Sequence, residues 1–397
     1  MHDWQQILLG DVLLDIADGG TPSRLDPNNF NGGIPWVVID DIKHEIWETK
    51  ETLSKKGLSS SSAKLWPVDT VILSTGATIG EVGVAKVPLA TKQGISGLVC
   101  NRRINHRFLY YKLQSLKNYL NSIAQGSTIR EVRPPIIKRI EIDLPTIQEQ
   151  IGIAKVLEVM DDAIKQTEAL IRKYQHIKQG LMQDLLKVKE SWTILPLGIA
   201  CKKGGGSVQT GPFGSQLHSS DYKDEGIPII TVEHLGDNEI IHKNLPLVGK
   251  EDYRRLSKYK IITGDLVFSR VGAIDRCAYV SENENGWLFS GRLLRVRPGS
   301  LFDSRFLSYL LNHYPSRLWI LNNSVGSTMK CLNTTILSEL PIPIPSMTEQ
   351  KEIGEKISSI DRLIQDLVQE MEKLTRIKQG LMQDLLTGKV RVNALLE

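Results

Sequence analysis

The sequence predicts an α+β protein made of two pseudo-repeated heads, each a mixed α/β domain with short strands, that are separated by two long helices. Three observations lead to this prediction. A ten-residue segment occurs twice, and the landmarks of the first half recur in the same order in the second half. Each half also ends in a long stretch whose apolar residues follow a heptad spacing.

The repeat has no gaps toward the end of each half. The sequence IKQGLMQDLL occupies residues 177–186 and again residues 377–386, an offset of 200 residues. At the same offset, Glu149-Gln150 matches Glu349-Gln350. Ten consecutive identities are not expected by chance in a chain of this length, so we infer an internal duplication.

The beginnings of the two halves also correspond. Trp4-x-x-Ile7-x-Leu9-Gly10 resembles Trp192-x-x-Leu195-x-Leu197-Gly198 at an offset of 188 residues, so the second half carries about a dozen more residues between these landmarks. Each half has β-branched runs bounded by Gly, Pro or Asp, which are typical of buried strands: 36–39, 69–74, 229–232 and 265–269. Two unrelated α+β domains with similar strands are the alternative.

The long stretches predict helices with well-marked starts. Pro145-Thr146-x-x-Glu149 and Pro345-Ser346-x-x-Glu349 each place a hydroxyl at the N-cap and a carboxylate three residues later, the pattern of a capping box. A helix of about 40 residues rises roughly 60 Å and would leave its apolar stripe in water, so we expect the two stripes to bury each other. The alternative is an ordinary helical bundle inside a single core. The residues predicted to pair the helices are Ile153, Leu157, Met160, Ile164, Ile171, Leu181, Leu185, Ile353, Ile357, Ile360, Ile364, Leu367, Met371, Leu374, Leu381 and Leu385.

These patterns divide the chain into four parts. The first head takes residues 1–145 and the first long helix residues 146–190. The second head takes residues 191–345, and the second long helix with a C-terminal tail takes residues 346–397.

Composition sets wide limits on function. The net charge of +4 permits nucleic-acid binding without requiring it. The four cysteines are scattered without a C-x-x-C pair, so we expect no zinc site and a reducing cytosol. No signal peptide and no apolar run of membrane-spanning length is apparent, so we expect a cytoplasmic protein without a membrane partner.

The motifs of nucleotide and methyl-transfer chemistry are missing. We find no G-x-x-x-x-G-K-[ST], no [DN]-P-P-[YF] and no glycine-rich cofactor loop, so the sequence predicts no catalytic residue, metal or cofactor of its own. Asp40-Asp41-Ile42-Lys43 contains the D-x-K of some nucleases, but a polar loop explains it better. The segment 202–207 (KKGGGS) could cradle a phosphate, although a flexible loop is favoured.

The helix motifs resemble a known family. Leu144-Pro145 through Glu149-Gln150, Ile344-Pro345 through Glu349-Gln350, the tails at 178–186 and 378–386, and the loop Gly211-Pro212-Phe213-Gly214-Ser215 are similar to those of type I restriction–modification specificity subunits. The resemblance covers essentially the whole chain. The doubled helix motif is specific, and the head motifs are moderately so.

This resemblance implies a complete set of expectations. Each head would be a target recognition domain that reads one half of an asymmetric, bipartite double-stranded DNA target. The two helices would pack as an antiparallel coiled coil and act as a spacer. Two methyltransferase subunits would dock around it, and motor-nuclease subunits would join them. S-adenosylmethionine, ATP and Mg²⁺ would be bound by those partners, and this chain would be non-catalytic.

Two other classes of function remain open at this point. One is a self-contained nuclease or methyltransferase, and the other is a coiled-coil scaffold whose heads bind protein.

Base and phosphate contacts need polar or basic side chains on loops. The candidates in the first head are Thr21, Ser23, Arg24, Lys43, Thr75, Thr78, Ser127, Thr128 and Arg130. Those in the second head are Ser215, Gln216, His218, His234, Arg270, Arg276, Ser327, Thr328 and Lys330.

One motif is shared by both heads. Gly126-Ser127-Thr128-x-Arg130 matches Gly326-Ser327-Thr328-x-Lys330, so we predict contacts to phosphates, which are common to all DNA. A structural turn that caps the following element is the alternative. Positions that differ between the heads should instead carry specificity, and Thr75 with Arg270 is one such pair.

Overall fold

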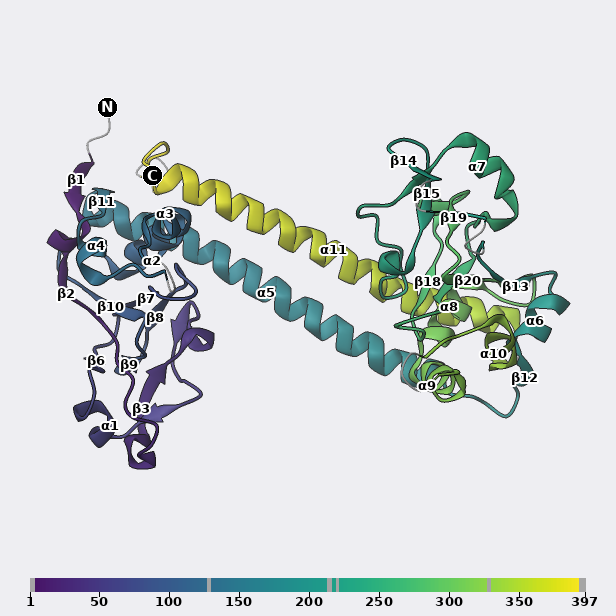
Figure 1. Cartoon of the computed structure of the whole chain (residues 1–397), viewed down its shortest axis with the longest axis horizontal. Helices are drawn as coiled ribbons and strands as arrows, with labels where there is room; N and C mark the ends of the chain where they lie inside the picture. Colours follow the sequence, from purple (N-terminus) through teal and green to yellow (C-terminus); the bar gives the residue numbers. More distant parts are fainter. Residues whose placement is uncertain (1–3, 127–129, 213–215, 219–220, 327–329, 393–397) are drawn as a thin grey trace. The chain divides into compact units, whose positions relative to one another are not determined.

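The computed structural model describes residues 4–126, 130–212, 216–218, 221–326 and 330–392 (Figure 1). The chain forms two compact units. Unit 1 takes residues 1–168 and 369–397, and unit 2 takes residues 169–368. Each unit therefore combines one head with a part of both long helices.

Head 1 is built on a five-stranded sheet of order β2-β10-β7-β8-β4 and a four-stranded sheet of order β5-β3-β9-β6. A third, two-stranded sheet pairs β1 with β11. The strands are β1 (Gln5–Leu8), β2 (Leu13–Asp18), β3 (Phe30–Val37), β4 (Glu45–Ile46), β5 (Thr52–Leu53), β6 (Leu65–Trp66), β7 (Val71–Ser74), β8 (Val82–Ala85), β9 (Leu89–Thr91), β10 (Ile95–Cys100) and β11 (Glu141–Leu144). The helices are α1 (Lys55–Ser59), α2 (His106–Ser115), α3 (Lys117–Ile123) and α4 (Pro134–Lys138).

Head 2 has sheets of order β13-β20-β17-β18 and β14-β16-β15-β19, and β12 pairs with β21. The strands are β12 (Thr193–Pro196), β13 (Ser207–Thr210), β14 (Tyr222–Lys223), β15 (Ile227–Ile230), β16 (Leu247–Val248), β17 (Leu266–Ser269), β18 (Cys277–Tyr279), β19 (Leu288–Phe289), β20 (Leu293–Arg297) and β21 (Pro341–Ile344). The helices are α6 (Leu197–Lys203), α7 (Lys250–Arg255), α8 (Ser304–Asn312), α9 (Tyr314–Asn323) and α10 (Thr334–Glu339).

The two heads repeat one topology. The strand order β2-β10-β7-β8 corresponds to β13-β20-β17-β18, and the β1–β11 pair corresponds to β12–β21. The predicted strand runs at 69–74 and 265–269 form β7 and β17, which are buried along their whole length. Head 1 adds β4, which pairs in parallel with β8 at the edge of the sheet. The predicted α+β fold with two repeated heads is therefore confirmed.

The long helices are α5 (Ile147–Leu185) and α11 (Met347–Leu385), each of 39 residues. As predicted, Thr146 Oγ1 accepts from the backbone N–H of Glu149, and Ser346 Oγ accepts from that of Glu349, both at 3.3 Å. The second half of the predicted capping box differs, because each glutamate side chain accepts from a tryptophan instead. Within the described residues, none of the helices has a stretch long and apolar enough to cross a bilayer.

The helices run antiparallel in each unit. In unit 1, Arg391, which follows α11, binds Glu149 at the start of α5, and Lys378 binds Asp161 further along. In unit 2, Lys178 of α5 binds Asp361 of α11 at 2.7 Å, and Lys189, which follows α5, binds Glu349 at the start of α11. In each unit, residue numbers increase along one helix while those of the contacting residues on the other helix decrease, so α5 and α11 run in opposite directions.

All residues predicted to pair the helices are buried or half-buried. Ile153, Leu157 and Leu385 lie in one apolar cluster with strand residues of head 1, and Ile353 and Ile357 lie in the matching cluster of head 2. These ends of the stripes therefore pack into the heads as well as facing the other helix.

We expect the carboxylate of Glu149 to contribute more to the free energy of unfolding than that of Glu349, which occupies the matching position of the repeat. Glu149 is 1% exposed and accepts from Trp4 Nε1 at 3.2 Å and from Arg391 at 2.5 and 2.9 Å. Glu349 is partly exposed and binds Trp192 and Lys189. Glu149→Ala should lower the free energy of unfolding by about 3 kcal/mol and the matched Glu349→Ala by about 1 kcal/mol. Urea denaturation of the two variants measures this, and equal losses would contradict the assignment.

Candidate nucleic-acid interface

A loop at residues 19–29 of head 1, named here the tip loop, carries Thr21, Ser23 and Arg24, and all three are exposed. Its base is fixed by close backbone approaches. The N–H groups of Gly19 and Gly20 donate to the carbonyl oxygens of Ile95 and Thr91, and a Cβ added to either glycine would lie 2.1 Å from a backbone atom. The loop is therefore a preformed projection rather than a loose segment.

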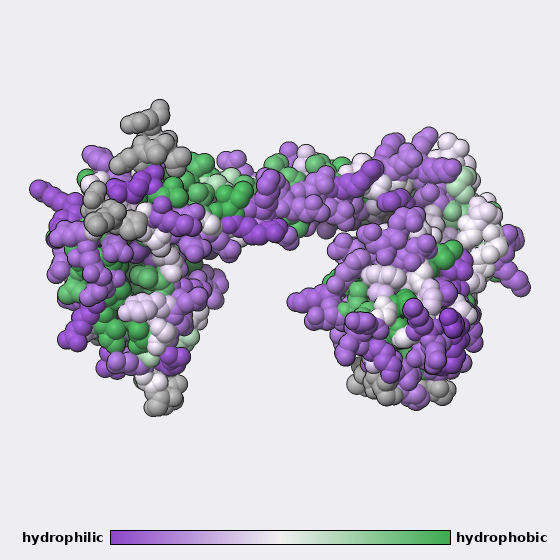
Figure 2. Space-filling model, turned by 90° about the horizontal axis from the view of Figure 1, so that it is seen from above, coloured by the Kyte–Doolittle hydropathy of each residue, from purple (hydrophilic) through white to green (hydrophobic). Residues whose placement is uncertain are grey.

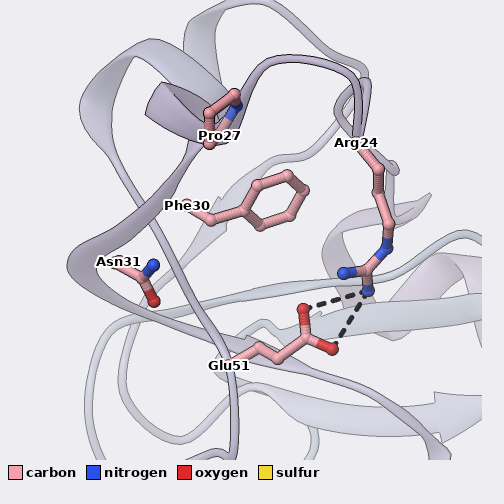
Figure 3. A pocket seen from close by; sticks show the side chains of 5 residues that line it. All are labelled: Arg24, Pro27, Phe30, Asn31 and Glu51. Atoms are coloured by element: carbon pink, nitrogen blue, oxygen red, sulfur yellow. Dashed lines mark hydrogen bonds and ion pairs between the residues drawn. The ribbon is translucent and has the colours of Figure 1, made fainter.

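Arg24 is held against the head rather than extended from it. Its guanidinium lies 3.0 and 2.9 Å from the two carboxylate oxygens of Glu51, beside Phe30 (Figure 3). It also lies 5.1 Å from the Phe30 ring centre and 5.6 Å from that of Trp36. The hydrogen bond raises the pKa of Arg24 and lowers the pKa of Glu51. This ion pair neutralises much of the charge that we predicted to contact DNA.

Thr75 lies inside head 1. It is 2% exposed and its hydroxyl donates to Asp18 Oδ1 at 3.1 Å, while Ser96 donates to the same oxygen at 2.7 Å. Its carbonyl accepts from the N–H of Val132. The geometry gives Thr75 a structural task, whereas Lys43 and Thr78 are exposed.

Arg270 occupies the same place in head 2. It follows β17 as Thr75 follows β7, and its carbonyl accepts from the N–H of Leu332. Its Nη1 donates to Thr210 Oγ1 at 3.2 Å and to the carbonyl of Gly291 at 3.3 Å. Thr210 ends β13 as Asp18 ends β2. The pair singled out in the sequence is thus structurally equivalent, with a carboxylate site in one head and a guanidinium in the other.

The remaining candidates of head 2 differ in exposure. His234 is 3% exposed, and its ring nitrogens bond to Thr231 and to the carbonyl of Lys243. Gln216 is half-buried and accepts from Tyr259 at 2.7 Å. His218 and Arg276 are exposed.

The shared Gly-Ser-Thr motif is described only at its edges. Ser127, Thr128, Ser215, Ser327 and Thr328 lie outside the described residues. The two cations at the end of the motif do lie within them. Arg130 donates to the carbonyl of Asn121 at 2.7 Å, near the end of α3, and Lys330 donates to the carbonyl of Leu321 at 2.6 Å, near the end of α9.

Both cations therefore bind the C-terminal end of the preceding helix, where carbonyls lack intrahelical partners and a positive charge is stabilising. This geometry supports a capping role, although for the preceding element and not the following one.

The weak catalytic candidates have structural contacts. Asp41 is buried and its two oxygens accept from the backbone N–H groups of Val38 and Lys50. The segment 202–207 turns against residues 297–301, and the carbonyl of Gly204 accepts from the N–H of Ser300. Across the described ranges, no group of three or more His, Cys, Asp or Glu side chains could hold a metal ion.

Two equivalent sites that were not predicted from the sequence join the heads to the long helices, and they are named here the helix-docking sites. In unit 1, Asp161 accepts from Tyr111 Oη at 2.7 Å and from Lys378 Nζ at 2.5 Å. In unit 2, Asp361 accepts from Tyr309 Oη at 2.7 Å and from Lys178 Nζ at 2.7 Å. Burial and the neighbouring carboxylate raise the pKa of both tyrosines.

These sites give the ten-residue repeat a physical meaning. In unit 1 the head packs against the copy at 377–386, with Leu385 and Leu386 in its core. In unit 2 the head packs against the copy at 177–186, with Leu186 in its core. Each head thus receives the copy that belongs to the other half of the sequence. The signal was available in the matched Asp161 and Asp361, but a sequence offset does not say what a residue contacts.

The site in unit 1 extends to a histidine. Arg107 lies 3.0 Å from Glu158 of α5, forms an ion pair with Glu45, and lies 3.1 Å from His44 Nε2. The His44 ring stacks on Tyr110 with the ring centres 4.7 Å apart. Burial lowers the pKa of His44 below its ordinary value, opposed by the nearby Asp161.

Comparison with known proteins places these features in context. A family model described as the type I restriction modification DNA specificity domain matches residues 1–173 and 212–378. The chain is 22% identical over 415 residues to the type I restriction enzyme MjaVIII specificity subunit of Methanocaldococcus jannaschii, covering 99% of this chain and 94% of that protein. It is 22% identical over 416 residues to the EcoBI specificity subunit of Escherichia coli, covering 95% and 85% of the two chains.

A solved structure shares the fold. The S subunit of a type I restriction–modification system from M. genitalium matches with a TM-score of 0.61 at 16% identity, over 96% of both chains.

Acidification should weaken unit 1 through His44. The folded state resists protonation of this ring, so His44 contributes stability above its ordinary pKa of 6.5, and this contribution is lost as the pH falls through that value. We expect wild type to lose stability relative to His44→Phe between about pH 7.5 and pH 5.5. Urea denaturation at both pH values measures the difference. The two proteins differ only at residue 44, so a parallel pH dependence would contradict the assignment.

Proposed function

Because the chain belongs to the family of the type I restriction modification DNA specificity domain, we propose that it is the subunit that reads the DNA target of a type I restriction–modification complex. The observation that carries this proposal is the repeated head. Two copies of one topology carry different side chains at equivalent positions: Asp18 with Thr75 in head 1, and Thr210 with Arg270 in head 2.

The two heads would read different half-sites. A symmetric dimer with identical heads reads a palindrome, whereas dissimilar heads joined in one chain read an asymmetric and interrupted sequence. The exposed polar candidates that would contact the duplex are Thr21, Ser23, Lys43, Thr78, His218 and Arg276. The buried Thr75 and His234 would act by supporting the loops rather than by touching DNA.

The helices would set the gap between the half-sites. Each 39-residue helix is continuous and contributes residues to both units. A continuous helix resists bending over this length and rises about 1.5 Å per residue. We assign the domain boundaries accordingly, with heads at 1–145 and 191–345 and helices at 146–190 and 346–397.

Methyltransferase subunits would dock on the helices, one on each copy of the repeat. The buried side of the repeat is explained by the heads, but its exposed side is identical too. Ile177 and Ile377 are both 42% exposed, and a Cβ on Gly180 or Gly380 would meet nothing within 4 Å. Figure 2 shows hydrophobic residues among hydrophilic ones on the surface of the helices.

Glycine inside a helix costs about 1 kcal/mol relative to alanine, so an open glycine at both positions indicates a partner that approaches closely. Two equivalent surfaces fit two copies of one partner. The chemistry would then lie in the partners, with S-adenosylmethionine in the methyltransferases and ATP with Mg²⁺ in the motor-nuclease subunits, acting with this chain in the cytoplasm.

Mapping of methylated adenines tests the proposal. Co-expression of the chain with its methyltransferase subunit should methylate adenines only within an asymmetric, interrupted target. Adding seven residues at matched places in both helices lengthens each by about 10 Å, so the gap should grow by about three base pairs while both half-sites stay unchanged. A continuous or palindromic target would contradict the proposal that the two heads bind different half-sites. An unchanged gap would contradict the proposal that the helices set its length.

The open glycines should control assembly. Gly180→Leu and Gly380→Leu improve helix propensity, so the free chain should fold, but each should prevent one methyltransferase subunit from binding. Mass measurement should find two partners on wild type, one on each single variant and none on the double variant. Gln166→Leu, an exposed position at which the second half has Asp366, is the matched control and should retain both. Full occupancy of the double variant would refute the docking surface.

A further inference from the structure

We propose that Leu25, at the end of the tip loop, recognises the methyl group of a thymine in the half-site read by head 1. This inference rests on the proposed DNA-reading function and adds a residue and a base to it. Leu25 is 96% exposed, the highest value among the large apolar side chains of the described residues.

The backbone around Leu25 is fixed from several sides. The N–H of Leu25 donates to Ser23 Oγ at 3.4 Å, and the side chain of Asn29, which is buried, donates to the carbonyl of Ser23 at 2.9 Å. Asp26 accepts from the N–H of Asn28 at 3.0 Å and binds Lys56 at 2.7 Å. An apolar side chain on a preformed projection loses little conformational freedom when it binds, which favours recognition.

Arg24 anchors the tip loop to the body of head 1. Glu51 and the rings of Phe30 and Trp36 hold its guanidinium, as Figure 3 shows for Glu51 and Phe30. Glu51 forms an ion pair with Arg24, and Asp26 forms one with Lys56. The repulsion between each carboxylate and a phosphate backbone is therefore reduced. Lys55 is exposed at the start of the nearby α1, which leaves a small surplus of positive charge.

The chemistry of the DNA grooves then selects the base. The thymine C5-methyl is an apolar group on a base edge in the major groove, and apolar side chains are its usual partners. Leu25 cannot donate or accept a hydrogen bond, so it cannot distinguish the polar edges of the other bases. A projecting loop is also the kind of element that reaches into a groove from a rigid scaffold.

A double-mutant cycle between the protein and the DNA tests this assignment. The complex of the chain with its methyltransferase subunit is titrated with its target duplex, and each thymine is replaced singly by deoxyuridine, which lacks the methyl group. At one of these positions, wild type should bind the duplex that carries deoxyuridine about fourfold more weakly than the unmodified duplex. This is the loss expected for one apolar carbon group. Leu25→Ala should bind the unmodified duplex about fourfold more weakly and should not distinguish thymine from deoxyuridine at that position.

Leu14→Ala is the matched control, because Leu14 is also an exposed leucine of head 1, at 73%, but lies on β2 outside the loop. It should keep the full response to deoxyuridine. The assignment is overturned if Leu25→Ala keeps that response, if wild type responds at no thymine, or if Leu25→Ala weakens binding to every duplex alike, as a wedge between base pairs would. If wild type does not prefer its target over an unrelated duplex, the proposed function itself fails.

Discussion

Each head is joined to the helices by a half-buried carboxylate that binds two groups at once. Asp161 holds Tyr111 from head 1 and Lys378 from the opposite helix, and Asp361 holds Tyr309 and Lys178 in the same way. A carboxylate that loses one partner in such a place keeps its desolvation cost without its compensation, so the groups act as a set. The heads can carry different loops because this junction does not change.

The junction also explains which parts of the repeat stay identical. A second contact repeats beside it: Gln150 accepts from the N–H of Asn105 and donates to the carbonyls of Arg103 and Pro145, and Gln350 makes the same three bonds with Asp303, Leu301 and Pro345. Because each head receives the helix segment of the other half, a change in one copy would have to be matched in a distant part of the chain. Two identical copies of the ten-residue segment satisfy both helix-docking sites.

Much of the fold could be predicted from the sequence, because the signals are local or periodic. The β-branched runs form β7 and β17, and the prolines and hydroxyls mark the starts of α5 and α11. The heptad spacing identified the buried side of each helix but not what covers it, since Ile153 and Leu157 also pack against strands of head 1. Nor could local pattern show that Glu149 binds a tryptophan 145 residues away, or that Glu51 neutralises Arg24. The residues of the candidate site were the hardest to predict, because a polar residue after a strand can be exposed, like Thr78, or buried, like Thr75.

The equivalent positions of the two heads show how one scaffold can serve two targets. In head 1, Thr75 and Ser96 donate to the carboxylate of Asp18; in head 2, Arg270 donates to Thr210 at the corresponding place. The backbone bonds around them are the same, since Val132 and Leu332 donate to the carbonyls of Thr75 and Arg270. Acceptor and donor chemistry are thus exchanged without a change in the course of the chain. Because Thr75 is buried, a substitution of this kind would act through the loops that it supports and not by touching a base, while the contacts of Asp161 and Asp361 with the helices remain intact.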